Sequence, residues 1–89
     1  MPNIKQQEKR VRIASRQRLE NLRYRSTIKT LAKRLDDAVA EGDAGAVAHA
    51  HRRLVQTIDR AAARGAIHRN TAARRKSHAA RVVAGPESQ

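Results

Sequence analysis

Residues that break helices are almost absent from this sequence. There is no proline between Pro2 and Pro86, and the four glycines of the chain are Gly42, Gly45, Gly65 and Gly85. Proline and glycine most often mark the ends of helices, and no segment shows the alternation of β-branched residues that is typical of a strand. The chain is therefore suited to a few long helices, and we predict an all-α fold.

The glycines divide the chain into three predicted helices, at about residues 5–41, 44–63 and 68–84, with a tail at 85–89. Gly42 and Gly65 are placed to end the first two helices, and Asp43 is a candidate N-cap for the second. At 1.5 Å per residue the first helix would be about 55 Å long. Short loops favour antiparallel neighbours. We expect a single domain over residues 1–89, a three-helix bundle with a long projecting N-terminal helix.

Apolar residues recur at helical spacing in only the second half of the first predicted helix. Before that point they are scattered, with Ile4, Val11 and Leu22 on one side of the helix and Ile13 on another. A helix without an apolar face needs stabilisation from outside the protein core, and here we expect it from a bound partner. The regular stripe consists of Tyr24, Ile28, Leu31, Leu35, Ala38 and Val39.

The predicted core is thin. Tyr24 is the only aromatic residue, and much of the apolar content is alanine, which buries little area. At about 25 cal/mol per Å² such a core leaves a small chain marginally stable, so we predict a protein that is only partly ordered before it binds. The second helix contributes Val47, Ala50, Leu54, Ile58 and Ala61, and the third Ala72, Ala79, Ala80 and Val83.

The chain is strongly basic, with 20 Lys and Arg against 8 Asp and Glu and a formal net charge of +12. Most of these cations are arginines, whose planar set of donors suits phosphate. Self-repulsion of this size disfavours a compact state unless a polyanion neutralises it. Residues 1–34 and 60–89 carry the positive charge and residues 35–59 are net acidic. This pattern predicts two nucleic-acid contact regions separated by a solvated segment.

The cations of the first helix fall into two rows at about 100° per residue. Like charges spaced i, i+4 destabilise an isolated helix, whereas two rows suit a helix that lies between phosphate backbones. Polar side chains among them can bind phosphate or ribose hydroxyls. The predicted RNA-binding residues here are Asn3, Lys5, Lys9, Arg10, Arg12, Ser15, Arg16, Arg18, Asn21, Arg23, Arg25, Ser26, Lys29 and Lys33.

A second basic cluster opens the third predicted helix. Positive charge at a helix N-terminus opposes the helix dipole, and a bound phosphate would reverse this penalty because helix N-termini bind anions. Tyr24 could stack on a base, although its place in the apolar stripe favours packing. The predicted RNA-binding residues of the second cluster are His68, Arg69, Asn70, Arg74, Arg75, Lys76 and Ser77.

No pattern of catalytic or metal-binding residues is present. The chain has no cysteine and no glycine-rich phosphate loop. His49 and His51 are two residues apart and would point to different sides of a helix, which makes a poor metal pair. We expect no enzymatic activity, no metal and no cofactor. No apolar run approaches the length of a membrane span and no signal-peptide pattern is seen, so we expect a cytoplasmic protein without membrane partner or homo-oligomer.

Four stretches of the sequence resemble a known family: Asn3–Lys5, Arg25–Thr30, Glu41–Asp43 and, above all, Gly65–Ser77. Over about residues 3–83 the chain is similar to the family of the bacterial small-subunit ribosomal protein numbered twenty. The resemblance implies a three-helix bundle low on the body of the subunit. It implies direct binding to 16S ribosomal RNA early in assembly, at the junction of the 5′ domain with the long helix near the 3′ end. The partners would be this RNA and other ribosomal components, and the residues of both basic clusters would be the contacts.

Two other classes of function stay open on the residues alone. A basic architectural protein that binds DNA would share the charge, although no compact recognition helix or dimer seam is evident. An amphipathic helix at a membrane surface would need large apolar residues opposite its charges, and residues 5–23 offer few. Competition between ribosomal RNA and duplex DNA, and flotation with anionic vesicles, would separate these alternatives.

Overall fold

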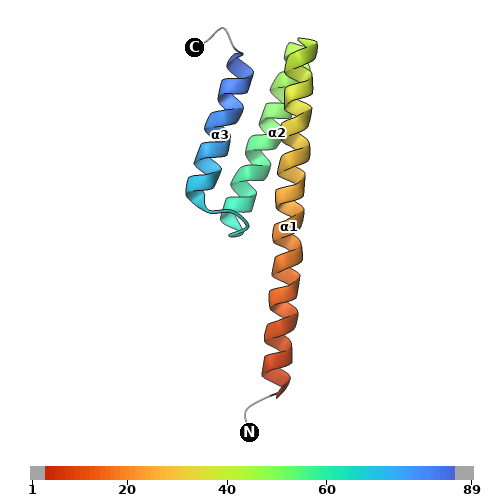
Figure 1. Cartoon of the computed structure of the whole chain (residues 1–89), viewed down its shortest axis with the longest axis vertical. Helices are drawn as coiled ribbons and strands as arrows, with labels where there is room; N and C mark the ends of the chain where they lie inside the picture. Colours follow the sequence, from red (N-terminus) through yellow and green to blue (C-terminus); the bar gives the residue numbers. More distant parts are fainter. Residues whose placement is uncertain (1–3, 86–89) are drawn as a thin grey trace.

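The computed structural model describes the backbone of residues 4–85 and the side chains of residues 7–85. It contains three helices, α1 (Ile4–Glu41), α2 (Ala44–Ala63) and α3 (Arg69–Ala84), and no strand in the described range. The molecule is elongated, with dimensions of 65 × 21 × 14 Å. One half of α1 packs beside α2 and α3, and the other half projects beyond them (Figure 1). The predicted all-α fold with a long N-terminal helix is confirmed.

The turn between α1 and α2 forms as the sequence predicts. Gly42 adopts a φ of 74°, a left-handed conformation that glycine takes without steric cost. Its N–H donates to the carbonyl oxygens of Ala38 and Val39, both at 3.1 Å. Asp43 is the N-cap of α2, and its side chain accepts from the N–H of Ala46 at 3.2 Å. Two residues therefore suffice to reverse the chain and bring α2 back along α1.

The end of α2 is a Schellman motif. Gly65 has a φ of 76° and donates to the carbonyl of Ala62 at 3.1 Å, while Ala66 donates to Ala61 at 2.8 Å. Ala66 is almost fully buried, so the turn also contributes to the core. This geometry fixes the direction in which the chain leaves α2 and starts α3.

The predicted start of the third helix is one residue too early. His68 is the N-cap of α3 and has an extended backbone, with φ −72° and ψ 148°. Its imidazole Nδ1 accepts from the N–H of Asn70 at 3.1 Å. The side chain replaces an intrahelical partner that the first helical N–H groups lack. Histidine is a less common N-cap than Ser, Thr, Asp or Asn, which is why the sequence pattern placed it inside the helix.

The core lies between the second half of α1, α2 and the inner side of α3. The predicted stripes of α1 and α2 are confirmed, and Tyr24 packs against the edge of the core. On α3 the prediction is half wrong: Ala80 is exposed and Val83 is 38% exposed, and Val82 packs against the core instead. Ala79 and Ala80, like Val82 and Val83, are adjacent in the sequence. The sequence therefore does not show which member of each pair faces the core. The buried core residues are Ile28, Leu31, Leu35, Ala38, Leu54, Ile58, Ala61, Ala66, Ala72 and Ala79.

Candidate nucleic-acid interface

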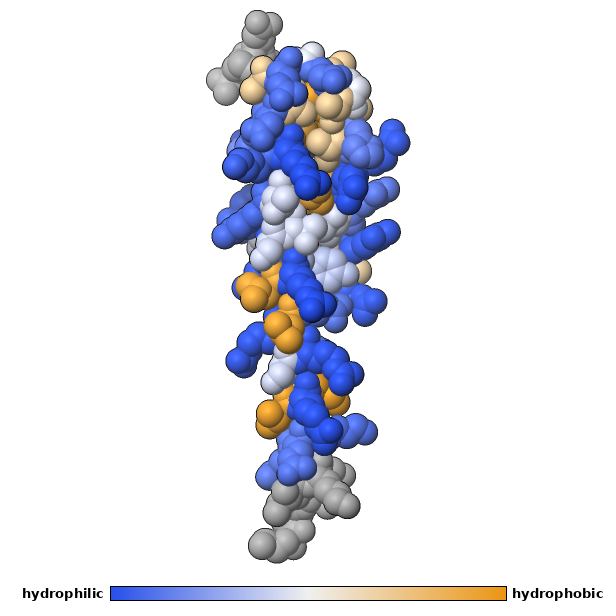
Figure 2. All heavy atoms as spheres, turned by 90° about the vertical axis from the view of Figure 1, so that its right-hand side faces the viewer, coloured by the Kyte–Doolittle hydropathy of each residue, from blue (hydrophilic) through white to orange (hydrophobic). Residues whose placement is uncertain are grey.

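The projecting half of α1 contributes no buried side chain to the core of the described chain. Every side chain from Gln7 to Leu19 is exposed, including Val11 at 65% and Leu19 at 56%. Figure 2 views the molecule from the side of α1 and shows separate apolar groups surrounded by hydrophilic side chains. The helix here must be stabilised by something other than the bundle.

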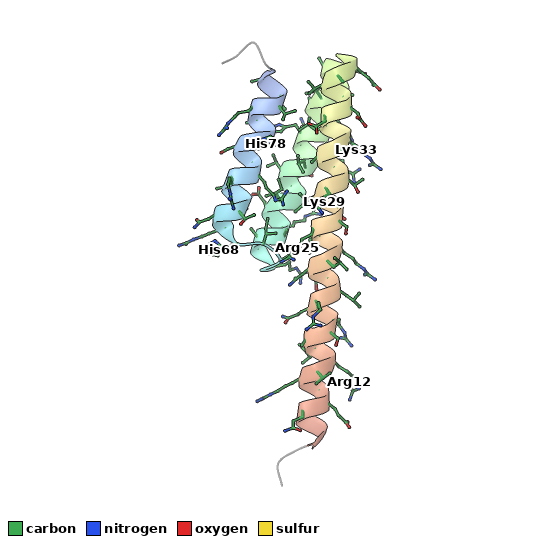
Figure 3. The ribbon with its side chains drawn as sticks, viewed as in Figure 1. Arg12, Arg25, Lys29, Lys33, His68 and His78 are labelled. Atoms are coloured by element: carbon green, nitrogen blue, oxygen red, sulfur yellow. The ribbon has the colours of Figure 1, made fainter. Side chains whose placement is uncertain are left out.

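The first cationic row consists of Lys9, Arg12, Arg16 and Arg23. All four side chains are exposed, and at 100° per residue they lie on one face of α1. Arg12 lies in the part of α1 that projects beyond the other helices (Figure 3). Of the other candidates, Asn3 and the side chain of Lys5 lie outside the described residues, while Arg10 is exposed and Asn21 is half-buried.

Sequence reasoning missed one member of this face. Arg34 is exposed and follows Arg23 by eleven residues and Arg16 by eighteen, which are spacings that return to the same side of a helix. The spacing alone could have found it. Because Arg34 lies where α1 packs in the bundle, it extends the first cationic row alongside the other helices.

The second cationic row consists of Arg18, Arg25, Lys29 and Lys33, all exposed. Arg25 and Lys29 line a shallow hollow together with Ile67 and Arg75. The fold thus brings one candidate residue of α3 next to three of α1, because Ser26 lines the same hollow. No sequence pattern could place these residues together, because the contact depends on the path of the α2–α3 turn.

An open groove lies between α1 and α3. It has a volume of about 460 Å³ and an apolar floor that includes Leu54 and Ile58 of α2. Arg74, Arg75 and His78 line it from α3, and the carboxylate of Asp36 lies on the α1 side. Two predicted RNA-binding arginines therefore flank an apolar opening. His78 was not among the predicted site residues, and it belongs to the same wall of the groove.

The remaining candidates of α3 differ in what their side chains do. Arg69, Asn70 and Ser77 are exposed, and His68 is exposed while it caps the helix. Lys76 instead reaches α2, where its ammonium lies 3.0 Å from the carboxylate of Asp59. Lys76 is therefore the one predicted site residue of α3 whose charge has an acidic partner among the described residues.

Acidic residues neutralise little of the interface. Between residues 7 and 85 the structure holds two ion pairs, Glu20 with Arg64 at 3.8 Å and Asp59 with Lys76 at 3.0 Å. Neither pair includes a member of the two cationic rows. Both rows thus present uncompensated charge along α1, and an incoming polyanion would not have to displace an internal partner.

Among the described residues, no three His, Asp or Glu side chains lie close enough together to hold a metal ion. None of the described helices combines the length and the apolarity that a membrane-spanning segment needs.

Proteins with similar sequences are proteins of the small ribosomal subunit. The small ribosomal subunit protein bS20 of Kocuria rhizophila is 42% identical over 84 residues, which cover 94% of this chain and 98% of that protein. The protein of the same name from Heliobacterium modesticaldum is 46% identical over 77 residues, covering 86% of this chain and 88% of that protein. The one from Roseiflexus is 43% identical over 84 residues, covering 94% and 91%.

The family model described as ribosomal protein S20 matches residues 2–84. The chain therefore belongs to the ribosomal protein S20 family, which the resemblance of the Gly65–Ser77 stretch indicated. The members of this family are structural ribosomal proteins, not enzymes, in agreement with the prediction of a non-catalytic chain.

Proposed function

We propose that this protein is a structural constituent of the bacterial small ribosomal subunit that binds 16S ribosomal RNA directly and stabilises its folding during assembly. Membership of a family of small-subunit ribosomal proteins supports the location. The observation that carries RNA binding is the exposed surface of α1, where two rows of cations run from the projecting half into the bundle with no acidic partner in the described chain.

The charge distribution supports a polyanion as the missing partner. A helix with cations spaced i, i+4 is destabilised in isolation, and phosphates on either side of α1 would convert this repulsion into attraction. We assign the RNA contacts to the exposed residues of both cationic rows and to the start of α3. In this assignment Arg74 and Arg75 extend the second cationic row across the groove onto α3.

Competition binding tests the proposal. Labelled 16S ribosomal RNA would be bound by the full chain and challenged with unlabelled duplex DNA or transfer RNA at fixed salt. We expect 16S RNA to compete at least tenfold better than either, because positioning contacts to a folded RNA add to the general attraction of phosphates. Equal competition by duplex DNA would favour the architectural DNA-binding alternative and reject the proposal.

Sedimentation of a cell lysate through a sucrose gradient tests the location. Detected by antibody, the protein should run with the small subunit at both low and high magnesium. A protein that stays at the top of the gradient, or that follows the chromosomal DNA, would contradict a ribosomal role.

A further inference from the structure

The groove between α1 and α3 opens onto the hydrophobic core. The second half of α1 and α3 run in the same direction, with α2 beside both (Figure 1). The floor of the groove includes Ile28, Leu54 and Ile58, and the half-buried Ala32 and Val82 also line it. No Tyr, Phe or Trp side chain of the described residues lines it. Its volume of about 460 Å³ lies in the range of pockets that hold small organic ligands, and its floor is aliphatic.

The groove stays open because α3 contributes only small side chains to the buried core. Its buried residues are Ala72 and Ala79, whereas α2 contributes Leu54 and Ile58 together with an alanine. An alanine side chain ends at its Cβ atom, so neither residue of α3 can extend across to α1. The atoms along this space lack the dispersion contacts of a close-packed interior. A hydrocarbon chain in the groove would supply the missing methylene groups.

Positive charge lies along the α3 side of the groove. Arg74, Arg75 and His78 line it, and His78 lies on the side of α3 that faces the other helices (Figure 3). The guanidinium of Arg74 donates to the hydroxyl of Thr71 at 3.4 Å, and Thr71 lines the groove as well. Neither arginine belongs to an ion pair of the described chain. Two guanidinium groups are therefore available to bind a carboxylate.

Negative charge lies at the other end of the groove. Arg75 and Ile28 line one neighbouring hollow, so Arg75 lies at the level of Ile28 along the bundle. Asp36 lines the groove and follows Ile28 by two helical turns, which places it about 12 Å farther along α1. Its carboxylate has no cationic partner among the described residues. The groove is therefore aliphatic along its floor, cationic at one end and acidic at the other.

We propose that this groove binds a linear aliphatic carboxylate, with the head group between Arg74 and Arg75 and the hydrocarbon chain on the floor. The planar guanidinium groups match a carboxylate in geometry, and an unbranched methylene chain can follow the aliphatic floor. Asp36 disfavours a second carboxylate at the far end because like charges at short range repel. The inference concerns a free small molecule and does not depend on the proposed binding of RNA.

Two other anionic occupants fit the groove less well. A nucleobase is recognised by stacking on aromatic side chains or guanidinium planes, and the floor offers only aliphatic side chains. A free phosphate could bind the two arginines, but it would leave the floor uncovered. A carboxylate with a hydrocarbon chain satisfies both parts of the groove.

The first test is a titration of the ¹⁵N-labelled full chain followed by NMR, with octanoate, octanedioate and octylammonium as matched eight-carbon probes. We expect octanoate to shift the amide signals of Ala32, Leu54 and Val82 and to saturate a single site. Octanedioate should bind about tenfold more weakly because its second carboxylate meets Asp36, and octylammonium should not saturate this site. In the variant Asp36→Asn the difference between the two acids should narrow to about twofold.

Variants of the groove test its location. Ala32→Leu extends a half-buried side chain into the groove and should abolish octanoate binding, while the circular dichroism of the chain stays unchanged. The double variant Arg74→Gln and Arg75→Gln should bind octanoate about tenfold more weakly. Its matched control, Arg52→Gln and Arg53→Gln, removes the same charge from the exposed side of α2 and should bind octanoate normally.

Three results would overturn the inference: full binding of octanoate by Ala32→Leu, equal losses in the two arginine double variants, or shifts spread evenly over all three helices. Stronger binding of adenosine monophosphate than of octanoate at the same amides would reveal a nucleotide site and would also overturn it. An unmodified chain that binds 16S ribosomal RNA but not octanoate would reject this inference alone and leave the proposed function intact.

Discussion

The guanidinium of Arg64 lies 3.8 Å from the carboxylate of Glu20 and joins the C-terminal end of α2 to the middle of α1. The pair marks the place where α1 leaves the bundle. Side chains before it, from residue 7 to 19, are all exposed, and the first fully buried residue after it is Ile28. The side chain of Arg64 is largely exposed and that of Glu20 is partly exposed, so the pair adds little stability. The boundary that it marks separates a packed segment of α1 from one without tertiary support.

Hydrogen exchange should reveal this boundary in the free protein. We expect the amides of residues 7–19 to exchange much faster than those around Ile58, because a helix without packing opens locally at low cost. Addition of 16S ribosomal RNA should slow exchange in residues 7–19 while the core changes little. Uniform protection along α1 in the free chain, measured by mass spectrometry, would contradict the predicted partial order.

Charge removal on the first cationic row should weaken RNA binding strongly. In the triple variant Arg12→Gln, Arg16→Gln and Arg23→Gln, we expect the slope of log affinity against log salt to fall by about 0.9 for each phosphate that the variant no longer neutralises. The measurement is a salt titration of binding to 16S ribosomal RNA.

The matched control for charge removal substitutes Arg52, Arg53 and Arg60 with glutamine. These three residues are exposed on α2, and the variant loses the same net charge. It should keep most of the salt dependence. Equal losses in the two variants would show that binding follows net charge and not the row on α1.

The same substitution at two glycines should have opposite effects on stability. Gly65→Ala places a side chain at φ 76°, where no neighbouring atom lies within 4 Å, so the cost is conformational and about 1–2 kcal/mol. Gly45→Ala lies inside α2 and would meet only Asp43 at 3.5 Å, so it should stabilise by about 0.5–1 kcal/mol. Urea titration followed by circular dichroism measures both. If both substitutions changed the free energy of unfolding in the same direction, the result would contradict the conformation described for Gly65.

Truncation at the centre of the core should remove most of the stability of the bundle. Ile58 is fully buried, and Ile58→Ala is expected to cost about 2–5 kcal/mol. For a small chain this is a large part of the total free energy of unfolding. The control Val83→Ala, at a position that is 38% exposed, should change stability by about 0.5 kcal/mol or less. Thermal melts with equal midpoints would argue against the core assigned here.

Helix boundaries and the main apolar stripes could be predicted from the sequence because each depends on neighbouring residues. Gly42 with Asp43, and Gly65 alone, specify where helices end whatever the rest of the chain does. The cap at His68 escaped prediction because histidine is an uncommon choice there. Val82 and Val83 both satisfy helical spacing. Which of the two packs against the core depends on how α3 is oriented relative to α1 and α2.

In the candidate interface, too, some features could be predicted from the sequence and others could not. Both cationic rows follow from the spacing of residues along a single helix, and all members with described side chains are exposed. The approach of Arg75 to Arg25 and Lys29, and the pairing of Lys76 with Asp59, depend on the turn that begins at Gly65. The sequence pattern therefore predicts the cationic rows within one helix, but it cannot predict contacts between helices.

No proline or glycine interrupts α1 between its two ends, so the segment in the bundle and the segment outside it form one straight rod once bound RNA orders the outer segment. The part beyond Glu20 extends about 24 Å at 1.5 Å per residue. A tilt of the bundle by about 10° would carry the far end through about 4 Å, which is more than a hydrogen bond tolerates. Two RNA segments that bind the two ends of this rod can therefore bind at the same time only when the distance and angle between them match the length and direction of α1.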